Sequence, residues 1–247
     1  MSTPRAAIDL NCDLGEGAGH DADLMRLVTS ANVCCGLHAG SAELMAATVR
    51  LAVRLGVAVG AHPGHADRDH FGRRELPISP ADCAAAVEAQ IEALAAVAGA
   101  ALHHVKLHGG LYHQVGRDRV LAVAVATMLA ARWPRLVVYA QAGSQLATAA
   151  RDRGLAVAEE AFIDRRYRAD GSLAPRSSPE AVIDDPAEAA AQAVRLAAGR
   201  GVCSVEGGEI RIAADTLCLH GDGPRAVEVA MAARGALVAA GIPLRTA

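Results

Sequence analysis

Residues 102–113 read LHHVKLHGGLYH and place four histidines and one lysine within twelve positions. If the first seven residues form a strand, successive side chains point to opposite faces. His104, Lys106 and His108 then share one face, and Val105 lies on the other. A face that carries an ammonium group between two imidazoles does not suit packing against apolar helices. The pattern therefore predicts that this face points into the interior of a β/α barrel.

Lys106 is the only lysine in the chain, and the other 23 basic residues are arginines. In a chain that uses arginine everywhere else, a single lysine indicates a place where a compact ammonium works and a planar guanidinium does not. A buried ammonium without a countercharge would cost several kcal/mol. We therefore expect either a substrate anion or a protein carboxylate, such as that of Asp13, close to Lys106, and both alternatives stay open at this point.

The rest of the sequence alternates short apolar runs with alanine-rich helical stretches. Such alternation is typical of a parallel sheet whose strands are connected by helices. The predicted strands are 6–13, 31–38, 56–62, 102–108, 135–140, 155–162 and 216–222, and the predicted helices are 21–28, 41–54, 80–98, 117–132, 143–152, 186–199 and 224–239. A length of 247 residues suits one such barrel. We predict an α/β fold in which residues 1–247 form a single irregular seven-stranded parallel β/α barrel.

Two segments interrupt this alternation. Residues 203–214, CSVEGGEIRIAA, resemble a small hairpin around Gly207 and Gly208. Residues 164–182 are polar and have no clear helix or strand pattern, and loops of this length are usually functional or mobile.

Composition argues against several classes of partner. The net charge is −3 and aromatic residues make up 2% of the chain, which gives no basis for binding nucleic acid. No run of about 18 apolar residues and no hydrophobic signal region is apparent, so we expect no membrane partner. The six cysteines form no CxxC pair, which is typical of reduced thiols in the cytoplasm.

Polar side chains collect where the predicted strands end. In parallel β/α folds the carboxyl ends of the strands meet at one edge, and that edge carries the active site. A single histidine is more often a hydrogen-bonded core residue than a catalytic one, but chance does not place four of them at equivalent strand ends. The residues at these ends are Asn11, Asp13, His38, His62, His108, His220 and Asp222.

The glycine-rich segment DLGEGAG (13–19) is a poor nucleotide fingerprint. It lacks the G-x-G-x-x-G spacing, and the chain contains no Gly-Lys pair and hence no GxxxxGK[ST] loop. We expect a tight turn that exposes backbone near Asp13 rather than a phosphate cradle. The chain by itself shows no standard ATP site.

These motifs together resemble those of the LamB/YcsF family. The segments that carry the resemblance are IDLNCDLGEG, TSANVCCGLHAG, GVAVGAHPG followed by FGRR, HVKLHGGLYH, DRRYRADGSL and LCLHGDGP, in collinear order over roughly residues 8–225. The resemblance implies a barrel related to carbohydrate deacetylases. It also implies ATP-dependent opening of the lactam 5-oxoproline to L-glutamate, by a complex with two further subunits, B and C. ATP, with Mg²⁺, would be the co-substrate, and no tightly bound cofactor is implied.

The chain departs from the family pattern at several loop positions. The family usually has HVKPHGALYN where this chain has HVKLHGGLYH, and it usually has other residues at Leu37, Ser41-Ala42, His65 and Gly223. None of these changes removes a charged or imidazole group from the strand ends. His65, His70 and His113 are additions to which we assign no chemistry.

The resemblance and the strand-end pattern together give a set of candidate site residues. Ring opening needs a cation for the substrate carboxylate or a phosphoryl group, a base for water, and an acid for the leaving nitrogen. As catalytic residues we expect Asp13, His38, His62, Lys106 and His108. As substrate-binding residues we expect Asn11, Arg73, Arg74, Asp164, Arg165, Tyr167, His220 and Asp222.

Two other functions compete with this one. Asp13, His62 and His108 form an Asp-His-His set that could hold a divalent ion in a deacetylase-like hydrolase. The charge of Lys106, two residues from His108 on the same face, argues against that ion, and we expect no metal. The second alternative is a non-catalytic scaffold that only holds subunits B and C.

Overall fold

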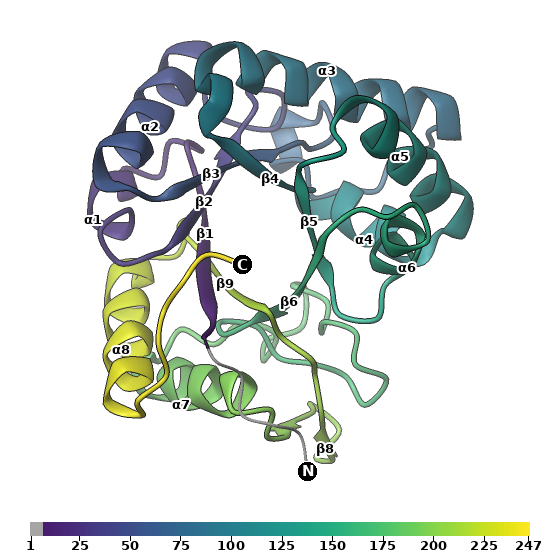
Figure 1. The fold of residues 1–247 in the computed structure, drawn as a ribbon. Coiled ribbons are helices and arrows are strands. Elements are labelled where there is room, and N and C mark those ends of the chain that lie inside the picture. The colour runs from purple at the N-terminus through teal and green to yellow at the C-terminus, as the bar shows by residue number, and fades with distance from the viewer. Residues whose placement is uncertain (1–6) are drawn as a thin grey trace.

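The structure is a computed structural model that describes residues 7–247. Seven parallel strands close into a barrel in the order β1-β2-β3-β4-β5-β6-β9 (Figure 1). They are β1 (Asp9–Leu14), β2 (Ser30–Cys34), β3 (Ala58–His62), β4 (Leu102–Lys106), β5 (Val137–Gln141), β6 (Val157–Phe162) and β9 (Thr216–His220). β9 pairs with both β1 and β6, which completes the ring. The predicted seven-stranded β/α barrel is confirmed; residue 6, at the start of the first predicted strand, lies outside the described residues.

The two faces of β1 show how the sequence pattern builds the barrel. Leu10 and Leu14 are buried in the hydrophobic core between strands and helices. Asp9, Asn11 and Asp13 alternate with them and hydrogen-bond to residues of other strands inside the ring. The barrel interior is therefore polar, and the apolar core is the layer between the sheet and the helices.

The helices form the outer layer. They are α1 (Asp21–Leu24), α2 (Ala42–Leu55), α3 (Pro80–Ala98), α4 (Gly109–Arg117), α5 (Arg119–Arg132), α6 (Gln145–Arg151), α7 (Pro186–Ala197) and α8 (Ala226–Ala239), with short 3₁₀ turns at Arg68–His70 and Gly99–Ala101. Ser79 and Asp185 cap α3 and α7, each followed by a proline in the first turn, as the sequence indicates.

The main difference from the predicted elements lies after β4. The sequence predicts one helix over 117–132, whereas the structure has α4 from Gly109 and a separate α5 whose N-cap is Asp118. Two glycines give the start of α4 a low intrinsic helix propensity. The helix forms because Leu111, Tyr112 and Val115 are buried against the core, which a local pattern does not reveal.

One segment, Pro80–Ala101, is long and apolar enough to cross a membrane by length and composition alone. No such segment was predicted from the sequence. Core helices of water-soluble proteins pass the same test, and here Cys83, Val87, Ile91 and Leu94 of α3 are buried in the apolar layer around the barrel.

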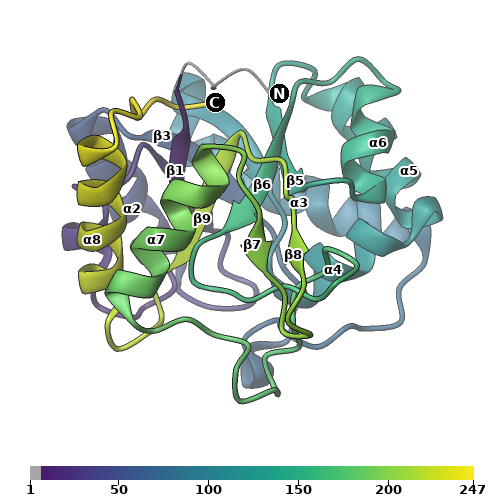
Figure 2. The ribbon, with the colours of Figure 1, turned by 90° about the horizontal axis from the view of Figure 1, so that it is seen from below.

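The two irregular segments lie side by side. The hairpin consists of β7 (Val202–Cys203) and β8 (Glu209–Ile210), which pair antiparallel apart from the barrel (Figure 2). The loop of residues 164–182 has no helix or strand, and Tyr167 bridges to Ser204 of the hairpin segment. The predicted hairpin is observed, and residues 164–182 form an irregular loop as the sequence indicates.

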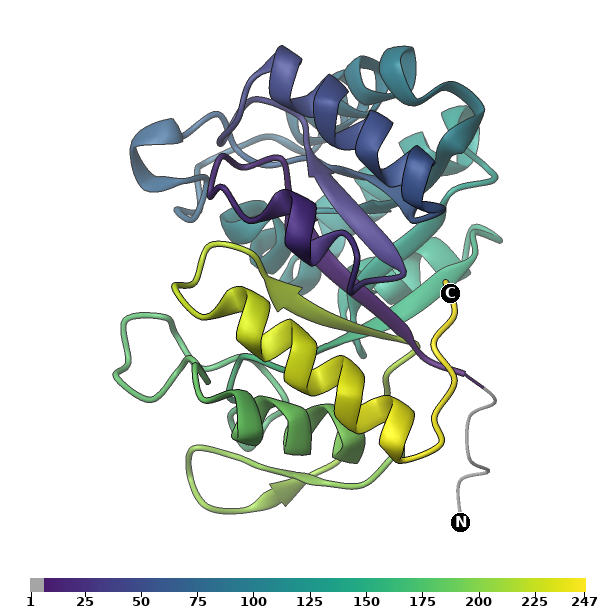
Figure 3. The same cartoon turned by 90° about the vertical axis from the view of Figure 1, so that its left-hand side faces the viewer.

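The C-terminal segment closes the amino-terminal edge of the barrel. Ile8 donates to the carbonyl of Pro243 at 2.9 Å, and the last residues run beside the start of β1 (Figure 3). The carboxyl edge is free of this cover, and it is there that the predicted site residues gather.

Candidate active site

Lys106, the last residue of β4, has two protein carboxylates as partners. Its Nζ lies 2.8 Å from Oδ1 of Asp13 and 3.1 Å from Oε1 of Glu160, and all three side chains are buried. Nζ also lies 2.9 Å from Sγ of Cys218. Burial disfavours the ammonium, but the carboxylates and this sulfur outweigh it and raise the pKa of Lys106 well above its usual value. Of the two alternatives left open by the sequence, the protein carboxylate is the one observed.

Beneath Lys106, an amide layer crosses the barrel. Asn32 donates to Oδ1 of Asn11 at 2.7 Å and to Oδ1 of Asp13 at 2.9 Å. Nε2 of His104 lies 2.9 Å from Oδ1 of Asn32. His104 and Lys106 therefore both point into the barrel, as the alternation in β4 predicts, and Asn11 supports Asp13 from below.

Three histidines and a glutamate lie together beside Asp13, and we refer to Glu16, His38, His62 and His108 as the imidazole cluster. The rings of His38 and His108 stack with their centroids 3.8 Å apart. Nδ1 of His108 is 3.0 Å from Nε2 of His62 and 3.4 Å from Oε1 of Glu16. Nε2 of His38 lies 3.2 Å from the same glutamate oxygen.

Two glycines make room for the stacked pair. A Cβ at Gly64 would lie 2.5 Å from Nδ1 of His38, and a Cβ at Gly72 would lie 2.7 Å from its Cβ. Gly72 also has φ of +63°, a conformation that favours glycine. The glycines of the GAHPG and FGRR segments thus let the two loops close over the cluster.

Burial sets the protonation of this cluster. It raises the pKa of Glu16 to about 7, with the charge of Asp13 adding to the effect, and lowers the pKa of His38 to about 4. Burial, with His62 and His38 nearby, lowers the pKa of His108 well below its usual value. Asp13 behaves oppositely: burial would raise its pKa, but His62 and Lys106 lower it well below the usual range. Asp13 is therefore a carboxylate at neutral pH.

We refer to the opening at the carboxyl edge of the barrel as the mouth. Across the mouth from the imidazole cluster, a carboxylate orients His220. Its Nδ1 and its backbone N lie 2.8 Å from Oδ2 of Asp164, and its ring stacks on Phe162 with centroids 5.8 Å apart. Burial would raise the pKa of Asp164, but His220 lowers it. Nearby, Asp222 pairs with Arg73. Because Asp164 bonds Nδ1 of His220, the other ring nitrogen, Nε2, is available to a ligand.

Arg165 differs from the other arginines of this mouth. Its side chain is 4% exposed, and it donates to the carbonyls of Ala174 (2.6 Å) and Ala181 (3.3 Å). Among residues 7–247, no carboxylate lies within ion-pair distance of it. Burial, with Arg176 close by, lowers its pKa to about 10, so it stays charged at neutral pH. The nearby charge of Asp164 raises the pKa of Arg165 but forms no ion pair with the guanidinium, which can therefore bind an anionic ligand.

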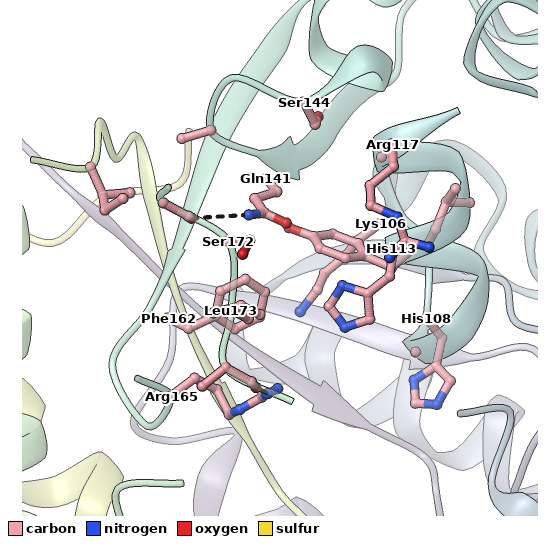
Figure 4. Close-up of a pocket in the computed structure, with 18 of the residues that line it drawn as sticks. Lys106, His108, His113, Arg117, Gln141, Ser144, Phe162, Arg165, Ser172 and Leu173 are labelled. Atoms are coloured by element: carbon pink, nitrogen blue, oxygen red, sulfur yellow. Dashed lines mark hydrogen bonds between the residues drawn. The ribbon is translucent and has the colours of Figure 1, made fainter. Parts of the chain in front are cut away.

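A cavity of about 1030 Å³ joins these groups, at the upper end of the roughly 300–1,000 Å³ usual for small-molecule sites. Figure 4 shows Lys106, His113, Phe162 and Arg165 converging on one space, with Gln141 across from them. Of the predicted site residues, its wall contains Asp13, His62, Arg73, Lys106, His108, Arg165 and His220.

The other predicted residues lie outside this wall. His38 stacks behind His108, Asn11 lies below Lys106, and Asp164 and Asp222 hold His220 and Arg73. Arg74 is exposed and bonds to Asp67 of its own loop, and Tyr167 accepts the backbone N–H of Phe162. The last two residues do not face the cavity.

Several residues of the site were missed. Glu160 is in β6 near its end, so the strand-end rule could have found it. Glu16 lies within DLGEGAG, beyond the end of β1, so the strand-end pattern does not include it; Gly15, Gly17 and Gly19 have positive φ, as the predicted tight turn requires. His113, to which no chemistry was assigned, and Tyr112 line the cavity. No local signal marks these two, because the helix that presents them was not predicted.

Two groups of side chains have donor atoms close enough to share a metal ion. One is the imidazole cluster, and the other is Asp13, Cys218 and His220. The Asp13-His62-His108 set predicted from sequence is split between them: Oδ2 of Asp13 lies 3.3 Å from Nε2 of His62, whereas its Oδ1 is occupied by Lys106 and Asn32.

Comparison with known proteins agrees with this architecture. The chain is 48% identical over 246 residues to a Heliobacterium modesticaldum protein that is named as the A subunit of 5-oxoprolinase, covering 96% of this chain and 97% of that one. It matches the crystal structure of a lactam utilization protein from Thermus thermophilus with a TM-score of 0.89, 47% identity and coverage of 97% and 99%.

A family 4 carbohydrate esterase from Streptomyces lividans matches with a TM-score of 0.52 and 12% identity, covering 98% of this chain and 93% of that one. This likeness supports the deacetylase-like fold class and nothing further. The LamB/YcsF family model matches residues 8–247. The chain therefore belongs to the LamB/YcsF family.

Proposed function

We propose that this chain is the ring-opening subunit of an ATP-dependent 5-oxoprolinase, which converts 5-oxoproline to L-glutamate in the cytoplasm. The names of its relatives support a lactam substrate. The observation that carries the proposal is Arg165, a buried guanidinium that lines the cavity without a carboxylate partner among the described residues. 5-Oxoproline is a small lactam with one carboxylate, and that carboxylate matches the missing countercharge.

With its carboxylate on Arg165, the lactam would extend toward the cavity face of Asp13 and Lys106. The two ends of the cavity thereby differ in role: Arg165 binds the part of the substrate that does not react, and the Asp13–Lys106 pair faces the part that does. Arg73, whose partner is Asp222, lies at the wall between solvent and the buried groups. Binding energy from a non-reacting carboxylate is a usual means of orienting a reacting group.

Ring opening adds water to the lactam carbonyl carbon and breaks the C–N bond. Asp13 is ionised and suited to accept the proton of the attacking water, and His62 and Lys106 keep it ionised. His220, oriented by Asp164, is suited to deliver a proton to the departing nitrogen. The positive charge of Lys106 also favours the negative charge that develops on the carbonyl oxygen.

Amide resonance makes the lactam carbonyl a poor electrophile, which is why coupling to ATP is needed. In the route we favour, ATP with Mg²⁺ phosphorylates the lactam oxygen and ADP leaves. Water then attacks the activated carbon and the C–N bond breaks, which gives an acyl phosphate, and a second water hydrolyses this acyl phosphate to glutamate and phosphate. The glycine segment 13–19 gives no support for a phosphate cradle, because the N–H of Gly15 is used by Asp21. We therefore place ATP on subunits B and C or at their junction with this chain.

Reconstitution tests this division of labour. The full chain would be assayed alone, with each partner protein, and with both, measuring glutamate release from 5-oxoproline with and without ATP. We expect glutamate only from the complete set with ATP. Rapid ATP-independent ring opening by the isolated chain would falsify the proposal.

The competing functions have distinct outcomes. A deacetylase-like hydrolase would release acetate from N-acetylated sugars without ATP or partners. A scaffold would support full turnover by the complex after Lys106→Met or Asp13→Asn, because assembly alone would be needed.

A further inference from the structure

We propose that the imidazole cluster binds one divalent transition-metal ion through Nε2 of His62, Nδ1 of His108 and Oε1 of Glu16. Unlike the Asp-His-His set considered from the sequence, this site contains Glu16, with Asp13 as a neighbour; His38, whose ring stacks parallel to that of His108, lies beside the ion and does not bind it. The inference is about binding and does not depend on the lactam reaction.

The first argument is the tautomer of two histidines. Nδ1 of His62 lies 2.9 Å from the carbonyl oxygen of Lys106, and Nε2 of His108 lies 2.8 Å from the carbonyl oxygen of Phe71. A backbone carbonyl can only accept, so each of these nitrogens carries the proton. The other nitrogen of each ring, Nε2 of His62 and Nδ1 of His108, is then a bare lone pair in the neutral imidazole.

The second argument is the approach of those two lone pairs. They lie 3.0 Å apart, which is a hydrogen-bond distance with no proton assigned to it. Two lone pairs at this separation repel unless a positive species lies between or beside them. Two imidazole nitrogens that coordinate one zinc ion, each at about 2.0–2.1 Å, come to such a separation.

The third argument is the donor set. Oε1 of Glu16 lies 3.4 Å from Nδ1 of His108 and 3.9 Å from Nε2 of His62, and these donor atoms lie within 4.8 Å of one another. Two imidazoles and one carboxylate suit zinc, cobalt or nickel rather than magnesium or calcium. The carbonyls behind His62 and His108 are the outer partners that orient metal-binding imidazoles.

The nearby ammonium does not oppose this ion. Lys106 is paired with both Asp13 and Glu160, so its charge is already more than balanced. Glu16 adds a further carboxylate on the side of the cluster. The objection to a metal that the sequence raised was the positive charge of Lys106 close to His108, and that charge is paired with two carboxylates.

The cluster is also accessible. Glu16, His62 and His108 line the same cavity as Arg165, so an ion could enter from the mouth and would face a bound ligand. A metal site requires such an entry path.

Titration of the chelator-stripped full chain with Co²⁺ and with Zn²⁺ tests the proposal. The readouts are the visible absorption of bound Co²⁺, the stoichiometry by calorimetry, and the thermal midpoint. We expect one equivalent, with affinity at least about tenfold lower in His108→Gln and in Glu16→Gln, since each loses a ligand. His70→Gln is the matched control: this exposed histidine bonds Asp67 outside the cluster, and its variant should bind as the parent does.

Two results would overturn the site. One is no saturable binding by the folded parent chain, in which case a proton is the positive species between His62 and His108. The other is equal binding by the parent and both cluster variants. If His108→Gln does not fold, Glu16→Gln and His62→Gln give the same comparison, and none of these readouts uses glutamate release.

Discussion

The two ends of the barrel interior are both polar but differ in how their groups are satisfied. At the amino-terminal end, Asp9, Ser30, Tyr139 and Thr216 form what we call the floor network. Oδ1 of Asp9 accepts from Ser30 at 2.7 Å, and Oδ2 accepts from Thr216 at 2.5 Å. At the mouth, within the described part of the chain, Arg165 has no carboxylate, and Oη of Tyr112, Oδ1 of Asp164 and Oε2 of Glu160 are buried without a hydrogen-bond partner.

This difference indicates that the floor network contributes to stability, whereas the mouth of the same barrel serves function. Asp9 and Asp13 are four residues apart on the same face of β1, yet burial raises the pKa of Asp9, whereas His62 and Lys106 overcome burial and lower that of Asp13. In the floor network, hydroxyl groups donate hydrogen bonds to the buried carboxyl group of Asp9. At the mouth, charged groups are available to bind a ligand. Changes at the mouth should therefore alter chemistry, and changes at the floor should alter stability.

The largest effect is expected from Lys106→Met. Turnover of the reconstituted complex should fall at least about 100-fold, because the lactam oxygen would lose its cation and Asp13 would lose the ammonium that, with His62, keeps it ionised. Removing one partner of this buried ion pair should also lower the free energy of unfolding by about 3–5 kcal/mol. Glutamate release and urea unfolding measure the two effects.

Asp13→Asn provides the companion to that variant, since it removes the base and keeps the ammonium paired with Glu160. It should fold and show a similar loss of turnover. Arg132→Met, on the exposed face of α5, is the control. If both Lys106→Met and Asp13→Asn retained turnover, the charged groups at the mouth would have no chemical role.

Arg165→Met should weaken substrate binding. Loss of a charge-assisted hydrogen bond of about 1.5–3 kcal/mol should raise KM roughly 10- to 100-fold, with a smaller change in kcat. Arg74→Met is the matched control, because Arg74 was predicted to bind substrate but pairs with Asp67 outside the cavity wall. Equal effects of the two substitutions would contradict the assignment of Arg165.

At the floor, Ser30→Ala should lower the free energy of unfolding by about 1 kcal/mol, since Asp9 would lose one buried donor. The kcat and KM of the folded protein should stay unchanged. Chemical denaturation and steady-state kinetics on the same preparation check both statements. A fall in kcat with no loss of stability would show that the floor takes part in the chemistry.

The smallest effect concerns pH. Because the folded-state pKa of Asp9 is raised above 3.8, its protonated form is favoured by folding. Its contribution to stability is fully present below pH 3.8 and is lost as the pH rises through the folded-state pKa. The stability of the parent relative to Asp9→Asn should therefore decline from acidic toward neutral pH. Denaturation curves across that range measure the difference in the free energy of unfolding between the parent and Asp9→Asn. If this difference increased with pH, the folded-state pKa of Asp9 would be lowered instead of raised.

The sequence predicted the barrel well because strand-helix alternation and capping signals are local. It also predicted that Lys106, Asp13, His62 and His108 meet, because one edge of a parallel sheet collects the strand ends. The family resemblance supplied the loop residues. Among these, Arg165 faces the cavity, whereas Tyr167, two positions along, is turned into the loop and holds the backbone of Phe162.

What could not be predicted depends on contacts distant in sequence. Glu160 pairs with Lys106 across the ring, and nothing in LAVAEEAF distinguishes it from Glu159, which faces outward to Arg151. The tautomers of His62 and His108 are set by two carbonyls, from Lys106 and Phe71, which have no sequence signature. Helix α4 depends on Gly110, where a Cβ would lie 2.2 Å from the carbonyl oxygen of Arg74.

The central claim is that the carboxylate of a lactam acid binds Arg165, which has no carboxylate partner at the mouth among the described residues. A crystal structure of the chain with 5-oxoproline, at a concentration that saturates binding in solution, tests it most directly. We predict the carboxylate on the guanidinium of Arg165 and the ring against Asp13 and Lys106. A ligand bound on another face, or a mouth left empty while binding is saturated, would contradict the account.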